Sequence, residues 1–362
     1  MLSSVEWGEY RIGDLFEVKG TLSFNKEALV SGDEYDYVTR TSQNQGILQT
    51  TAFVNKENLN EAGTWSLGLL QMDFFYRQRQ WYAGQFVRKV VFKGSLPNGS
   101  ISFFTTVLNA LKPKLLSVLV RDVNNPFLDS YIQLPTRDGA IDFMFMERFV
   151  AELKAQRVAE LKAYLAVTGL SDYTLTPEEQ QAIQHFQEGN LQWGKRTFRS
   201  IFNHIKQGRR LKKDDQQKGS LPFVMSGVSN TGVVSHISNP IVIFPSNSIT
   251  IDIFGNSFYR NYSFGAGDDT GVYWSTERKY SKSQMLFFTT AMGRSLFGQY
   301  SYGNKLRSSQ SLNFKMSLIE KGGEIDYNYM ETFIRAIEKL VIRDVVLYAD
   351  RELAATEQII NQ

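Results

Sequence analysis

The sequence predicts a mixed α/β (α+β) protein with two homologous domains, separated by two long antiparallel helices that form a coiled coil. Three observations predict this fold. Motifs of the first half recur in order in the second half, short β-like runs broken by Gly, Asn and Ser precede a helix in each half, and that helix carries a long apolar stripe. The 362 residues also suffice for two domains of ordinary size. We therefore expect a pseudo-twofold internal repeat.

The internal repeat is a series of seven matches. Trp7-Gly8 recurs as Trp193-Gly194, and Leu15-Phe16 as Ile201-Phe202, both 186 residues further on. At the same spacing, residues 37–47 (YVTRTSQNQGI) align with residues 223–233 (FVMSGVSNTGV). The later matches, at spacings of 183 or 184, are Phe75-Tyr76-Arg77 with Phe258-Tyr259-Arg260, Ala83-Gly84 with Ala266-Gly267, FFTT at 103–106 with FFTT at 287–290, and IDFMFMERFVAEL from Ile141 with IDYNYMETFIRAI from Ile325. The kept order predicts a tandem duplication.

The repeat sets the expected domain boundaries. Residues 1–141 form the first domain, 142–190 a helix and a short connector helix, 191–325 the second domain, and 326–362 a long C-terminal helix. The runs at 35–39, 86–92, 101–106, 242–244 and 249–253 are expected to be strands.

The two long helices begin at equivalent residues. Asp142 and Asp326 are the expected N-caps, and the apolar stripe that follows each of them is too long for one small domain to cover. Residues 143–167 are therefore expected to pack antiparallel against residues 327–360. Between the halves, Thr176-Pro177-Glu178-Glu179 is a capping box that opens the connector helix.

The composition excludes several kinds of site. Without cysteine the chain has no disulfide, thiolate nucleophile or cysteine-ligated metal, and no two of its three histidines have a metal-binding spacing. We expect neither a metal site nor a catalytic residue. The N-terminus does not resemble a signal peptide and no window approaches a membrane span, so the cytoplasm is the expected location.

The charge is unevenly distributed. Residues 1–141 have 14 basic and 14 acidic groups, whereas residues 191–325 have 18 basic and 8 acidic groups, a net charge of +10. The segments 142–190 and 326–362 are acidic, with net charges of −4 and −3. A basic block suggests a surface that faces a polyanion, although a solvated face explains it equally well.

Enzymatic motifs are scarce. The chain has neither the cofactor loop nor the Pro-Pro-Tyr or Pro-Pro-Phe motif of an amino-methyltransferase, and FGAGDDTG at 264–271 has the wrong spacing for a nucleotide loop. Asp268, Glu277 and Lys279 have the residue types of a metal-dependent nuclease, and this is one alternative function. Another is a non-catalytic coiled-coil adaptor whose basic face binds RNA or an acidic protein.

Candidate DNA-reading side chains occur in both halves. In the first half, Arg77, Gln78, Arg79 and Gln80 are four successive side chains that can bind guanine or adenine edges, although a solvated loop also explains them. In the second half, Arg209, Arg210, Lys212 and Lys213 are expected to hold phosphates. Two further pairs are readout candidates: Arg260 with Asn261, and Lys305 with Arg307. The repeated Asn44-x-Gly46 and Asn230-x-Gly232 fit turns at least as well as contacts.

The order of these features resembles the specificity subunits of restriction-modification systems, of Type I or Type IIB-like kind. The resemblance covers essentially the whole chain and rests on the Trp-Gly opening, the aligned segments at 37–47 and 223–233, the Ala-Gly before a β-run, and the Ile-Asp before each helix. It implies two target recognition domains, each reading part of a bipartite duplex DNA sequence. It also implies a partner methyltransferase, separate or fused to a nuclease, that binds S-adenosylmethionine and modifies adenine. It does not assign Arg77, Arg79 or Arg260, because recognition residues vary most in this family.

Overall fold

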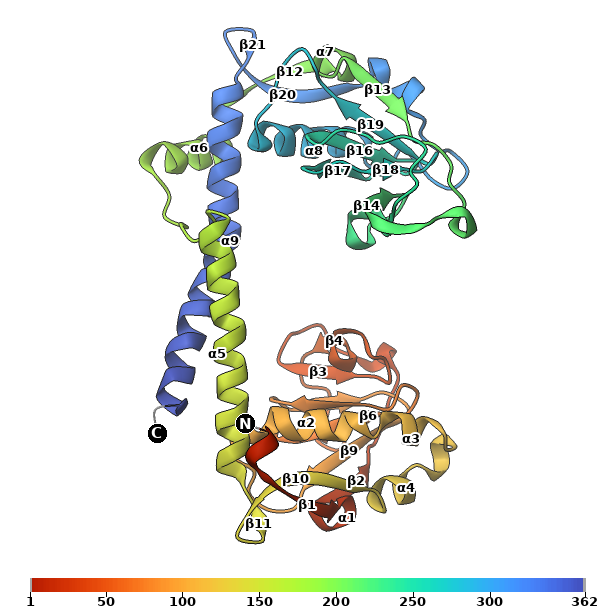
Figure 1. The fold of residues 1–362 in the computed structure, drawn as a ribbon, viewed down its shortest axis with the longest axis vertical. Helices are drawn as coiled ribbons and strands as arrows, with labels where there is room; N and C mark the ends of the chain where they lie inside the picture. Colours follow the sequence, from red (N-terminus) through yellow and green to blue (C-terminus); the bar gives the residue numbers. More distant parts are fainter. Residues whose placement is uncertain (1, 361–362) are drawn as a thin grey trace. The chain divides into compact units, whose positions relative to one another are not determined.

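The computed structural model describes residues 2–360, and the chain divides into two compact units (Figure 1). The first unit comprises the described residues up to Tyr164 and from Tyr348 onward, and the second comprises Leu165–Leu347. Each unit is a mixed α/β structure, as the sequence predicts.

The first unit contains short strands, short helices and one long helix. Its strands are β1 (Glu6–Arg11), β2 (Phe16–Gly20), β3 (Tyr35–Val38), β4 (Ile47–Thr51), β5 (Leu59–Asn60), β6 (Thr64–Gly68), β7 (Asp73–Arg77), β8 (Trp81–Ala83), β9 (Val87–Phe92), β10 (Tyr131–Arg137) and β11 (Ala140–Ile141). Its helices are α1 (Ile12–Leu15), α2 (Ile101–Ala110), α3 (Lys112–Leu116), α4 (Asn124–Leu128) and most of α5 (Phe143–Val167). Short 3-10 helices lie at Leu2–Ser4, Lys26–Ala28, Gln43–Gly46, Asn98–Ser100 and Val120–Asp122.

The second unit follows the same plan. Its strands are β12 (Gln192–Thr197), β13 (His204–Gln207), β14 (Lys218–Val224), β15 (Val233–Ile237), β16 (Ser248–Asp252), β17 (Ser257–Arg260), β18 (Gly265–Ala266), β19 (Thr270–Trp274), β20 (Lys315–Lys321) and β21 (Glu324–Ile325). Its helices are α6 (Pro177–Gln187), α7 (Phe198–Ile201), α8 (Lys282–Leu296) and most of α9 (Tyr327–Ile360). Its 3-10 helices lie at Lys213–Asp215, Ser229–Gly232 and Ser308–Asn313.

The sheets confirm the duplication. The orders β1-β10-β11 and β2-β9-β6-β7 in the first unit match β12-β20-β21 and β13-β19-β16-β17 in the second. The third sheet is β4-β3-β8-β5 in the first unit and β15-β14-β18 in the second, and in both it contains one parallel pair, β3 with β8 and β14 with β18. The Ala-Gly motif marks this pair, because Ala83 is paired with Val38 and Ala266 with Val224.

Equivalent aromatic rings form the two main cores. Phe16 and Phe104 meet edge to face with centroids 5.9 Å apart, and Phe202 and Phe288 do the same at 5.8 Å. All four side chains are essentially buried. Each pair joins the residue after the short helix α1 or α7 to the longer helix α2 or α8, so the repeated Phe residues are core residues.

Two expected strands are wrong. Residues 101–106 begin helix α2, and residues 242–244 form no strand beyond an isolated bridge between Phe244 and Phe264. In helices α2 and α8 the threonine hydroxyls of the FFTT motif bond to carbonyls one turn back, as Thr105 does to Ile101 at 2.8 Å and Thr289 does to Met285 at 2.7 Å. Thr105 also accepts a hydrogen bond from the Trp65 indole at 2.8 Å, which ties α2 to β6.

The expected N-caps of the long helices are confirmed. The Asp142 carboxylate accepts from the Phe145 backbone N–H at 2.9 Å, and Asp326 accepts from Tyr329 at the same distance. Within the first unit, Lys162 of α5 forms an ion pair with Asp350 of α9 at 2.8 Å. This contact agrees with two paired helices, whereas the antiparallel coiled coil along their full lengths stays a prediction.

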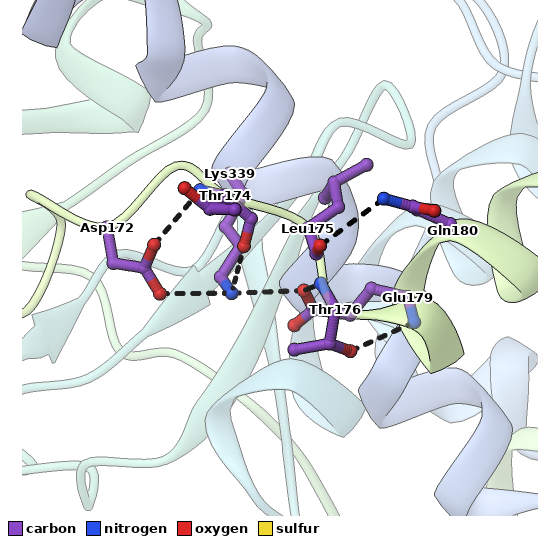
Figure 2. A network of polar contacts seen from close by, with 7 residues as sticks. All are labelled: Asp172, Thr174, Leu175, Thr176, Glu179, Gln180 and Lys339. Carbon is purple, nitrogen blue, oxygen red and sulfur yellow. Dashed lines mark hydrogen bonds and ion pairs between the residues drawn. The ribbon is translucent and has the colours of Figure 1, made fainter.

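The connector helix α6 is fastened to α9 within the second unit by the polar network in Figure 2. Thr176 and Glu179 form the predicted capping box. Lys339 of α9 donates to the Thr174 carbonyl at 2.8 Å and to the Glu179 carboxylate at 3.0 Å, and Asp172 lies 3.2 Å from the same ammonium. The hydrogen bond to Glu179 raises the Lys339 pKa, and the hydrogen bond from the Thr174 backbone N–H, followed by that from Lys339, lowers the Asp172 pKa. Among residues 2–360, no helix is long and apolar enough to cross a membrane.

Candidate nucleic-acid interface

The repeated Asn-x-Gly segments are turns, as one reading of the sequence predicts. Asn44 and Gln45 have φ values of 45° and 53°, and Asn230 and Thr231 have values of 47° and 51°. Each asparagine amide donates to a carbonyl three residues ahead, at 3.1 Å for Asn44 and 3.2 Å for Asn230. The glycine that follows also has positive φ, which glycine adopts without strain.

Arg77 supports the first of these left-handed loops, at Asn44 and Gln45, from inside the domain. Its side chain is 2% exposed, its Nε donates to Ser66 Oγ at 2.9 Å, and its Nη2 donates to the Gln45 carbonyl. Burial lowers the Arg77 pKa to about 10, so the group is still protonated at neutral pH.

Arg260 does the same in the second domain. It is 1% exposed, its Nε donates to Thr250 Oγ1 at 3.1 Å, and its Nη2 donates to the Thr231 carbonyl. Burial also lowers the Arg260 pKa. The structure therefore makes Arg77 and Arg260 supports of the loops, and it gives no support to base readout by either. Asn261, the next residue, is exposed.

The rest of the first-domain cluster is on the surface. Gln78, Arg79 and Gln80 are exposed in the loop between β7 and β8. Arg79 is held by the Asp36 carboxylate and by the Asp33 carbonyl at 2.6 Å. The hydrogen bond with Asp36 raises the Arg79 pKa. The loop is thus ordered, with its two glutamine side chains at the surface.

The two domains also contain equivalent pockets. The first has a volume of about 650 Å³ and the second about 570 Å³. Residues at the repeat spacings of 186 and 183 line both. The pairs are Asn25 with Leu211, Lys26 with Lys212, Glu27 with Lys213, Thr39 with Met225, Leu48 with Val234, Gly84 with Gly267, and Gln85 with Asp268. The duplication has therefore kept the position of the pocket while changing most of the side chains that line it.

The predicted basic residues gather at the second pocket. Arg209, Arg210, Lys212 and Lys213 are exposed, and the last three line the pocket. The exposed Arg307 reaches the same place, because its Nη1 donates to the Asp268 carbonyl at 2.6 Å. Lys305 is exposed and its ammonium lies 4.5 Å from the centroid of the Tyr302 ring.

The first pocket contains residues that the sequence reasoning missed. Arg40 and Gln85 line it, and Phe86 follows Gln85 with its ring 5.1 Å from the Arg40 guanidinium. Two features of the sequence point to this pocket. They are the aligned segments around Asn44 and Asn230 and the Ala-Gly motif, because both contain or adjoin residues that line the pockets. Nothing in the local sequence indicates that these separate segments meet.

The nuclease candidates do not form a metal site. Within residues 2–360 no group of three or more His, Cys, Asp or Glu side chains is placed to hold a metal ion. Glu277 and Lys279 are exposed after β19, whereas Asp268 lines the second pocket.

Two repeated domains, each with a loop held by a buried arginine and a pocket lined by polar and apolar side chains, define a duplicated recognition protein. The family of Type I restriction modification DNA specificity domains matches residues 4–163 and 190–346, and the chain therefore belongs to it. The chain is a non-catalytic, sequence-specific DNA recognition subunit of a restriction-modification system. It binds DNA, and its family has no catalytic cofactor of its own.

Relatives span nearly the whole chain. The specificity subunit S.BcgI of a Type II restriction enzyme from Heyndrickxia coagulans is 22% identical over 351 residues, which are 94% of this chain and 97% of that protein. The crystal structure of a Type I restriction-modification S subunit from M. genitalium is similar in fold, with a TM-score of 0.57 at 13% identity. That match covers 99% of this chain and 95% of the other.

Proposed function

We propose that each domain reads one half of a bipartite duplex DNA target through its pocket and the adjoining left-handed loop. The main support for this proposal is the pair of equivalent pockets, which are lined by different side chains. A shared position suits two readers that approach DNA in the same way. Different side chains suit two different half-sites, because the major groove presents a distinct donor and acceptor pattern for each base pair.

The two domains use different kinds of DNA contact. In the second domain, Arg209, Arg210, Lys212 and Lys213 bind phosphates, while Asp268, Asn261, Lys305 and Arg307 are the candidates for base contacts. In the first domain, which has net charge 0, Gln78, Arg79, Gln80 and Gln85 supply polar contacts. Specific contacts therefore contribute more of the first domain's affinity than electrostatic attraction does.

The partner is an adenine methyltransferase, separate or fused to the nuclease, and it holds the S-adenosylmethionine. It turns the target adenine out of the duplex once this chain has positioned it. We expect the complex to act in the cytoplasm. The Type II relative and the Type I fold neighbour support either kind of system equally.

Methylation sequencing tests this proposal. DNA is methylated with the reconstituted complex of this chain and its methyltransferase, and the modified target is read. A bipartite target is expected, with Gln85→Ala changing preference in one half and Asp268→Ala in the other. A contiguous target, or changes in the same half from both variants, would contradict one reader per domain. Competition by double-stranded RNA equal to that by DNA would favour the adaptor alternative.

A further inference from the structure

An exposed aromatic residue next to the lining residues of the first pocket has an unusual backbone conformation. Phe86 has a φ of 61°, in the left-handed region that bulky residues avoid, and its side chain is 51% exposed. Its carbonyl accepts from the Leu69 N–H at 2.9 Å. The strained backbone thus leaves the ring exposed to solvent. Strained residues that persist in a folded protein often belong to functional sites.

The second domain provides a comparison within the same chain. Asp269 is at the position equivalent to Phe86, and its carbonyl accepts from the Ile253 N–H at 3.0 Å, which is the same backbone bond. Asp269 is not among the described residues with positive φ. The shared fold thus forms this bond without strain, and the strained aromatic is particular to the first domain.

The surroundings of Phe86 combine polar and apolar groups. The Arg40 guanidinium lies 5.1 Å from the ring centroid and covers one face of the ring. Gln85, the preceding residue, lines the pocket together with the exposed Leu48 and Leu70. A ring inserted between base pairs would need both faces for stacking, and here one face is already occupied.

We propose that Phe86 contacts the methyl group of a thymine in the major groove of the first half-site, while Gln85 bonds the adenine of the same pair. In the major groove an A·T pair presents the thymine methyl group beside the adenine N6 and N7, which suit an apolar side chain and a glutamine amide. This inference rests on the proposed function, because it identifies one base pair that the first domain reads.

The test replaces the thymines of the first half-site by deoxyuridine, one at a time, and measures the binding of the reconstituted complex by fluorescence anisotropy. Loss of one contacted methyl group is expected to weaken wild-type binding roughly three- to tenfold at a single position. Phe86→Gly, which accommodates the positive φ, is expected to bind the thymine and deoxyuridine duplexes equally. Phe86→Leu retains an apolar side chain and should keep part of the preference.

Phe53→Gly is the matched control, because Phe53 is 52% exposed in the same domain and, unlike Phe86, has no chain neighbour that lines the pocket. It should keep the full thymine preference. Indifference of the wild-type complex to deoxyuridine at every position would overturn the inference, and so would a 2-aminopurine signal of unstacking that Phe86→Gly abolishes. Absence of any sequence preference in the wild-type complex would instead contradict the proposed function.

Discussion

Arg260 has in the second domain the position that Arg77 has in the first, and each donates to the carbonyl of the residue after a left-handed asparagine. Both side chains lie inside their domain. Each is the third residue of the repeated Phe-Tyr-Arg motif, and an arginine is ordinarily found at the surface. A buried arginine that donates to a loop carbonyl fixes the loop before DNA arrives, so less conformational freedom is lost on binding.

Arg77→Ala should therefore act on stability as well as on recognition. It leaves the Gln45 carbonyl and the Ser66 hydroxyl without their partner and opens a cavity, and we expect a loss of about 3 kcal/mol in the free energy of unfolding. Urea denaturation measures it. The neighbouring exposed variant Gln78→Ala should change stability by less than about 0.5 kcal/mol. Equal stability of the two variants would show that the loop does not depend on Arg77.

The basic residues at the second pocket should determine how strongly the affinity for DNA depends on salt. Changing Arg209, Arg210, Lys212 and Lys213 to Ala should weaken binding to all sequences and flatten the plot of log K against log salt by up to about 0.9 per residue. Gel shifts at several salt concentrations measure the slope. Lys321→Ala, an exposed cation at the end of β20, serves as the control. An altered sequence preference at unchanged slope would assign these residues to base readout.

The network in Figure 2 should matter for folding and not for DNA preference. Lys339→Met leaves the buried Glu179 carboxylate without its cation, and we expect about 3 kcal/mol of destabilisation in the second unit. Adding Glu179→Gln should restore part of the loss because it removes the uncompensated charge. Thermal unfolding of the single and double variants measures both effects. A single variant as stable as the wild type would show that the ion pair contributes nothing.

The sequence predicted the features that depend on local chemistry or on the repeat. The caps at Asp142, Asp326 and Thr176 were found because a capping residue and its partner are three residues apart. The helix at 101–106 was missed because Phe and Thr favour strands, and packing against β7 and the core overrides that preference. The burial of Arg77 was missed because its partners Gln45 and Ser66 are distant in sequence.

The surface loop after Arg77 gives the last prediction. Arg79 is fastened to Asp36, and the exposed Gln78 and Gln80 flank it, so the loop presents its donors in a fixed order. Arg79→Ala should relax recognition in one half-site only, by roughly tenfold to a hundredfold in site preference, which corresponds to about 1–3 kcal/mol for one good base contact. The other half-site and the methylation of bound DNA should be unaffected, and methylation sequencing of the reconstituted complex measures both. Unchanged specificity would mean that the loop is only solvated, whereas equal losses in both half-sites would indicate misfolding.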